Sequence, residues 1–157
     1  MNYDSKKDTL EHIYSVKEKL MLIILKLATR AEEHDLSKLS SPEKKVFDEV
    51  TPKLRGLEYG SEEYKEQLKE MRIALEHHYA NNRHHPEHFE NGINDMNLVD
   101  VIEMFCDWLA ATERHNTGDI IASININQKR FGMSDELANI FKNTVKDVFK
   151  INSDNNK

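Results

Sequence analysis

Few residues in this chain can interrupt a helix, and that scarcity most restricts the folds open to it. Five glycines and three prolines are spread over 157 residues, whereas a fold of many short strands needs frequent turns. Hydrophobic residues make up 38% of the chain and charged residues 32%, which is enough apolar content for a folded core. The sequence therefore predicts an all-α, single-domain helical bundle over residues 1–157, with its core at about 9–149 and a polar tail at 150–157.

Apolar residues recur at the three- and four-residue spacing of helices in most of the chain. Asp8 and Glu11 form a capping-box pattern, which predicts a first helix that continues without Gly or Pro to Ala31. Serine and proline before Glu43 suit the start of a second helix. Further helices are predicted from Ser61 through His78, from Leu98 to about His115, over 123–131 and from Ser134 to Phe149, with loops at Thr51-Pro52, Gly56–Gly60 and Asn91–Asn97. Residues 120–127 alternate apolar and polar side chains, so a short strand is an alternative there.

Charge and cysteine content restrict the compartment and the class of partner. The single cysteine, Cys106, cannot form an internal disulfide, and the polar start Met1–Asp8 does not resemble a signal peptide, so a cytoplasmic location is predicted. The longest apolar run, Leu20–Leu25, is too short to cross a bilayer. A net charge of −6 argues against duplex nucleic acid as a partner. Small anions remain possible ligands, because a metal supplies positive charge locally. A homo-oligomer also remains possible.

The segment His77–His88 holds five of the eight histidines. Neutral imidazole is the commonest protein ligand for a divalent metal, although a histidine-rich tract can also be a solvated loop or bind metal adventitiously. Helical spacing places His78 on the apolar stripe that includes Met71 and Leu75. A lone histidine on such a stripe is more often a hydrogen-bonded core residue. The segment therefore predicts a metal pocket if other parts of the chain supply ligands.

Four further residues are candidate ligands. His34 and Asp35 are adjacent and present two ligand types from one turn. Asp107 lies on a polar stripe with Asp100, Glu103 and Arg114, beside the small residues Ala110 and Ala111, which leave room for a hydrated metal or a phosphate; a solvated helix edge is the alternative. His12 is more difficult, because a straight helix would separate it from His34 by about 33 Å. His12 can bind the same metal only if the helix is broken, between Tyr14 and Lys19 or near Thr29.

Three elements occur in order: His34-Asp35-Leu36-Ser37-Lys38 followed by Glu43, then His77–His88, then Glu103-Met104-Phe105-Cys106-Asp107-Trp108. With an early histidine before them, they make the chain resemble the HD superfamily of metal-dependent phosphohydrolases. It is most similar to an uncharacterised family of phages and bacteria with HDxSK, HH…N.HH and EM..DW elements. The similarity spans about residues 12–112. Two features depart from it: no glycine stands between His12 and the His-Asp pair, and the second histidine pair follows the first sooner than in many members.

This resemblance implies an HD-type helical domain with one or two divalent transition metal ions, of Mn, Fe, Co, Ni or Zn. It implies the metal ligands His12, His34, Asp35, His78, His84 and Asp107, with the choices between His77 and His78 and between His84 and His85 left open. It further implies that Asp35, Lys38 and His85 are catalytic, and that Lys38, Asn82, Arg83, His88 and Arg114 bind substrate.

The expected function is that of a metal-dependent phosphohydrolase, a phosphomonoesterase or phosphodiesterase, in which metal-activated water attacks phosphorus. The expected substrate is a small phosphorylated molecule, a nucleotide or cyclic nucleotide, in the cytoplasm, or in the host cytoplasm if the protein is phage-encoded. Two alternatives remain open: a di-iron oxygenase-type HD protein, and a non-catalytic protein that binds a nucleotide or contacts a host protein.

Overall fold

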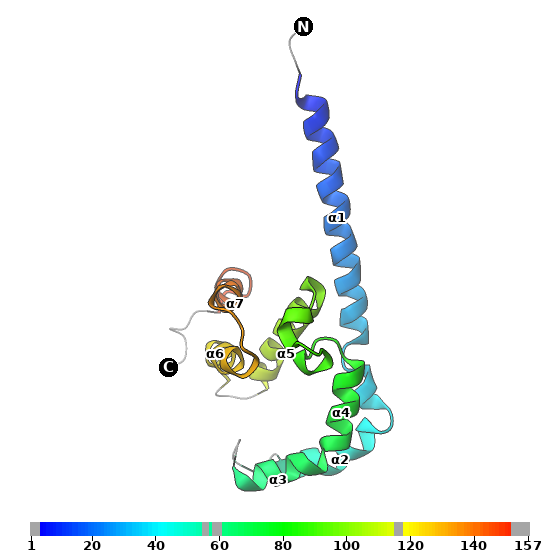
Figure 1. The fold of residues 1–157 in the computed structure, drawn as a ribbon, viewed down its shortest axis with the longest axis vertical. Coiled ribbons are helices and arrows are strands. Elements are labelled where there is room, and N and C mark those ends of the chain that lie inside the picture. The colour runs from blue at the N-terminus through cyan, green and yellow to red at the C-terminus, as the bar shows by residue number, and fades with distance from the viewer. Residues whose placement is uncertain (1–3, 55–56, 58–60, 115–117, 152–157) are drawn as a thin grey trace. The chain divides into compact units, whose positions relative to one another are not determined.

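The computed structural model describes residues 4–54, 57, 61–114 and 118–151, and Figure 1 shows its fold. Within those ranges the regular structure is helical and contains no strand, which confirms the all-α prediction. The α-helices are α1 (Lys6–Glu33), α2 (Glu43–Leu54), α3 (Glu62–Glu70), α4 (Arg72–Asn81), α5 (Leu98–Glu113), α6 (Ile120–Phe131) and α7 (Asp135–Asp147), and the 3-10 helices are η1 (Leu36–Leu39), η2 (Pro86–His88) and η3 (Gly92–Asp95). The chain divides into two compact units, Met1–His34 and Asp35–Lys157.

The first unit consists of α1, a helix of 28 residues without interruption. It begins at Lys6, whose backbone N–H donates to the Asp4 carboxylate at 3.0 Å, so the predicted start at Asp8 is wrong. The helix has no break between Tyr14 and Lys19 or near Thr29, which was the condition for His12 and His34 to bind the same metal. His12 therefore lies about 33 Å from His34 along the helix axis. The prediction that these two histidines bind one metal in the same chain is wrong, because no ion can span that distance.

The core of the second unit lies around α5, α6 and α7. Its buried apolar residues are Met104, Phe105, Leu109, Ile120, Ile124, Met133, Ala138, Phe141 and Val145. The Phe105 and Phe141 rings stack with their centroids 4.7 Å apart. Buried apolar residues in the described chain run from Val50 to Val145, inside the predicted range of about 9–149, which stays a prediction.

Two helix predictions in this unit are confirmed at their ends. Gly132 adopts a left-handed φ of 62° and ends α6, so residues 120–127 are helical and the alternative strand does not form. The Ser134 side chain accepts a hydrogen bond from the Leu137 backbone N–H at the start of α7. The predicted helix end at His115 and the tail beyond residue 151 lie outside the described residues.

The remaining helices, α2 to α4, differ from prediction at two points. Pro52 lies inside α2, where the sequence predicts a loop; the carbonyl that loses its partner belongs to Asp48, which is exposed and can bind water. The helix predicted from Ser61 through His78 is interrupted at Met71 between α3 and α4. The loop predicted at Gly56–Gly60 lies outside the described residues except for Leu57. α2 packs against η1, α3 and α4, which brings η1 and α4 to the same helix.

No helix in the described part of the chain is both long enough and apolar enough to cross a membrane.

We expect Phe141→Ala to lower the free energy of unfolding by about 3–5 kcal/mol, because it removes a stacked ring from the core. Phe141 is 4% exposed and contacts both Phe105 and Trp108. Urea denaturation followed by circular dichroism measures the change. Ile140→Ala is the matched control on the same helix, since Ile140 is 58% exposed and its loss should change the free energy by no more than about 0.5 kcal/mol. Equal effects of the two changes would contradict this description of the core.

Candidate metal centre

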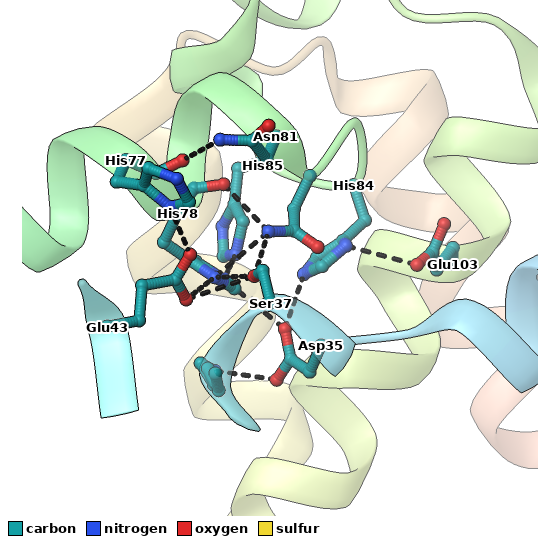
Figure 2. Close-up of polar contacts among 11 residues, drawn as sticks. Asp35, Ser37, Glu43, His77, His78, Asn81, His84, His85 and Glu103 are labelled. Atoms are coloured by element: carbon teal, nitrogen blue, oxygen red, sulfur yellow. Dashed lines mark hydrogen bonds and ion pairs between the residues drawn. The ribbon is translucent and has the colours of Figure 1, made fainter. Parts of the chain in front are cut away.

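Four metal-ligating side chains converge in the second unit. Asp35 stands at the start of η1, His78 in the last turn of α4, and His84 and His85 just before η2. One ligand atom from each of these four residues lies within 4.8 Å of every other (Figure 2). His78 Nε2 is 3.2 Å from Asp35 Oδ1 and 2.9 Å from His85 Nε2, and His84 Nε2 is 3.6 Å from the same Asp35 oxygen. This group of three imidazoles and one carboxylate can hold a metal ion.

The local backbone conformation directs these side chains toward one another. Asp35 has a left-handed φ of 59°, a conformation that aspartate tolerates better than most residues and that turns the chain into η1. His78 lies on the buried stripe of α4, as its spacing predicts, and is 2% exposed. The chain then turns so that the His85 backbone N–H donates to the Asn82 carbonyl at 3.3 Å. This turn presents His84 and His85 together.

A buried carboxylate lies behind His78. Glu43 is fully buried and accepts hydrogen bonds from His78 Nδ1 at 2.9 Å, His77 Nδ1 at 2.7 Å and Ser37 Oγ at 3.0 Å. An imidazole whose Nδ1–H donates to a carboxylate keeps a lone pair on Nε2. In that tautomer Nε2 of His78, which lies 3.2 Å from Asp35 Oδ1, would be available to bind a metal.

A second carboxylate, that of Glu103, stands behind His84. Glu103 of α5 lies with Oε1 3.0 Å from His84 Nδ1, and both side chains are buried. Figure 2 shows His84 between Glu103 and Asp35. A carboxylate this close to Nδ1 is well placed to orient the ring of a metal-binding histidine.

The electrostatics of the group favour a cation. Burial by itself raises the pKa of Glu43, but hydrogen bonds from His77, Ser37 and His78 outweigh it and hold the pKa below 4.5. Burial, followed by the neighbouring charges of His84 and His78, lowers the pKa of His85 from 6.5 to about 3, so this imidazole is neutral at pH 7. The ionised Glu43 thus lies behind a poorly solvated site in which His85 is neutral, and a divalent cation would offset carboxylate charge there.

Asp107 lies beside this group. One of its carboxylate oxygens is within 4.8 Å of an Asp35 oxygen, and its charge acts on His85. The predicted ligands Asp35, His78, His84 and Asp107 are thus brought together, and His85, predicted as a catalytic residue, joins them. His34 is the last residue of the first unit, and its role as a ligand stays a prediction.

The predicted substrate-binding residues divide into two groups. Lys38 reaches the centre, with Nζ 2.6 Å from Asp35 Oδ2. Asn82 is buried, and its side-chain amide donates to Ser37 Oγ and to the His78 carbonyl, each at 2.8 Å. It therefore supports the ligands instead of facing solvent.

The other three predicted residues have separate contacts. Arg83 donates two hydrogen bonds to Asp100. His88 Nδ1 donates to the Tyr79 carbonyl at 2.8 Å. Arg114 follows the last residue of α5, about 10 Å along the helix axis from Asp107. Roles for Arg83, His88 and Arg114 in substrate binding stay predictions.

Glu43 and Glu103 are the residues that the predicted site omits. Each appears in the sequence near a recognised element, Glu43 after the His34–Lys38 box and Glu103 four residues before Asp107. That spacing places Glu103 and Asp107 on one face of α5. Spacing alone does not show that either carboxylate lies behind an imidazole.

We expect Glu43→Gln to weaken Co²⁺ binding by about 10- to 100-fold, the usual cost of losing a partner of a metal-binding histidine. The amide keeps the shape of the side chain but loses the charge that holds His78 Nδ1–H. Isothermal titration of metal-free protein without a histidine tag measures the affinity. Glu49→Gln, at an exposed position of the same helix, is the control and should bind like the unmodified protein. Unchanged affinity in Glu43→Gln would show that Glu43 does not support the ligands.

Comparison with known proteins gives one match. No curated protein and no solved structure matches this chain. A family model described as a family of unknown function, DUF5662, matches residues 1–150. That span contains both units except for the last residues of the chain. The chain therefore belongs to the DUF5662 family.

Proposed function

We propose that this protein is a metal-dependent phosphohydrolase that acts on a small phosphorylated molecule of the nucleotide or cyclic nucleotide class. One observation carries the proposal: Nε2 of His78, His84 and His85 and one oxygen of Asp35 converge, while carboxylates lie behind two of these imidazoles. The nucleotide class rests on the resemblance of the three sequence elements to the HD superfamily.

The donor set supports a transition metal. Three imidazole nitrogens and one carboxylate oxygen suit Mn, Fe, Co, Ni or Zn, whereas Mg and Ca prefer oxygen ligands. An ion of this kind supplies Lewis acidity and lowers the pKa of water to about 7. In this proposal His85 is a ligand and not the acid for the leaving group, because its Nε2 lies 2.9 Å from Nε2 of His78.

The two oxygens of Asp35 have different partners in the proposed reaction. Oδ1 faces His78 and His84, while Oδ2 accepts a hydrogen bond from Lys38. An ammonium group has three donors, so Lys38 can hold Asp35 and still donate to a phosphate oxygen. Its side chain is 38% exposed, which leaves it within reach of a substrate. Lys38 would then stabilise the negative charge that grows on phosphate in the transition state.

We expect Asp35→Asn to reduce phosphate release by more than about 100-fold, because losing a direct ligand should cost more than losing an outer partner. The measurement uses untagged protein loaded with Mn, Co or Fe and a panel of nucleotides and cyclic nucleotides. Asp48→Asn is the control, since Asp48 forms an exposed ion pair with Lys44 on α2. Turnover that persists unchanged in Asp35→Asn would refute the proposed centre.

Lys38→Met should lower kcat/KM for phosphate release by about 100-fold, the effect of removing one donor to a developing oxyanion. Its Co²⁺ affinity should change by less than about 10-fold, since it contacts Asp35 only through Oδ2. Lys44→Met removes a matched lysine from an ion pair of the same length, 2.6 Å, and should leave both quantities unchanged. A Lys38→Met protein with normal kcat/KM would rule out a role for this ammonium in the reaction.

A further inference from the structure

The segment that carries His84 and His85 is held to α5 by a fork of two hydrogen bonds. Arg83 Nε donates to Asp100 Oδ1 at 3.1 Å, and Arg83 Nη2 donates to Asp100 Oδ2 at 3.0 Å. Asp100 is fully buried, and the guanidinium also lies 4.8 Å from the centre of the Phe89 ring. A planar guanidinium on a carboxylate fixes distance and orientation together, which a lysine ammonium cannot do.

Asp100 is itself held in place. Its carboxylate accepts the Asn97 backbone N–H at 3.1 Å, and the Asn97 side chain accepts the Asp100 backbone N–H in return. This reciprocal cap orders the first turn of α5. The fork therefore joins Arg83 to a rigid helix end.

The same two parts of the chain meet a second time at the metal centre. His84 follows Arg83 directly, and Glu103 follows Asp100 by three residues, which places both acidic side chains on one face of α5. His84 Nδ1 lies 3.0 Å from Glu103 Oε1. Arg83 and His84 thus contact successive turns of α5. The fork between Arg83 and Asp100 determines the position along α5 at which His84 meets Glu103.

We propose that Arg83 and Asp100 are positioning residues of the metal centre, which hold His84, and with it His85, in the geometry that binds the ion. This inference rests on the metal centre of the proposed function but not on its phosphohydrolase chemistry. It gives Arg83 a different part from the phosphate contact that the sequence predicts. The Arg83 side chain is 44% exposed, so it could contact a phosphate as well as hold the segment. The two roles can be distinguished by experiment.

Arg83→Lys discriminates between them, because it keeps the positive charge and loses the fork. We expect it to weaken Co²⁺ binding to metal-free protein by about 10- to 100-fold and to change the visible spectrum of bound Co²⁺, which reports coordination geometry. A phosphate contact predicts the opposite result, a raised KM with Co²⁺ affinity within twofold of the unmodified protein. That result would overturn the inference.

Arg72→Lys is the control. Arg72 forms an ion pair with Glu76 of the same helix at 3.7 Å, and the two side chains are 77% and 67% exposed. It should leave Co²⁺ affinity unchanged. An equal loss of affinity in Arg72→Lys would show that any such change disturbs binding, and would overturn the inference as well.

Asp100→Asn tests the pair from the other side and serves if Arg83→Lys does not fold. The amide oxygen can still cap α5, but the charged fork is lost. We expect a loss of Co²⁺ affinity like that of Arg83→Lys, and a double variant no weaker than either single one, as for two residues that act together. Additive losses would overturn the pairing.

Unmodified protein that binds Co²⁺ but releases no phosphate would refute the phosphohydrolase alone, whereas failure to bind Co²⁺ would refute both.

Discussion

The buried carboxylate of Glu43 joins the parts of the protein on which the candidate centre depends. It stands at the first residue of α2 and accepts hydrogen bonds from Ser37 of η1 and from His77 and His78 of α4. Leaving a carboxylate unpaired in this position would cost several kcal/mol, and these three donors offset that cost. The position also suits a negative charge, because the start of a helix carries the positive end of its dipole. The contacts that make the burial of Glu43 tolerable therefore also bring η1 and His78 together.

α5 provides the second support and links the centre to the core. Asp100, Glu103 and Asp107 follow one another at spacings of three and four and share a face. Asp100 and Glu103 contact the segment that carries the histidines, while Met104, Phe105 and Leu109 enter the hydrophobic core. One helix thus holds the ligand-bearing segment on one face and packs against α6 on another. Any shift of α5 in the core would move Glu103 relative to His84.

Helical patterning and side-chain chemistry made much of this arrangement predictable. The spacing of the apolar residues before His78 correctly indicated a buried face, and the Leu98 start, the Gly132 end and the Ser134 cap were all readable from local residues. Local signals failed where solvent or tertiary contacts decide the outcome. Met71 interrupts a helix without any breaker in the sequence and is itself buried. From the sequence alone, Glu103 is expected to lie on a solvated stripe. The structure shows that it lies against His84.

The sequence by itself determined that this chain is helical and that its candidate metal ligands, apart from His12, lie in three short elements. These features are predictable because helical periodicity and the presence of metal-ligating side chain types are properties of neighbouring residues in the sequence. Only the tertiary structure decided that His85 joins the ligands and that Glu43 and Glu103 stand behind two imidazoles. Those outcomes depend on contacts between residues far apart in the chain: Glu43 and His78 are 35 positions apart, and His84 and Glu103 are 19 positions apart. The local spacing of side chains carries no distance information over such separations.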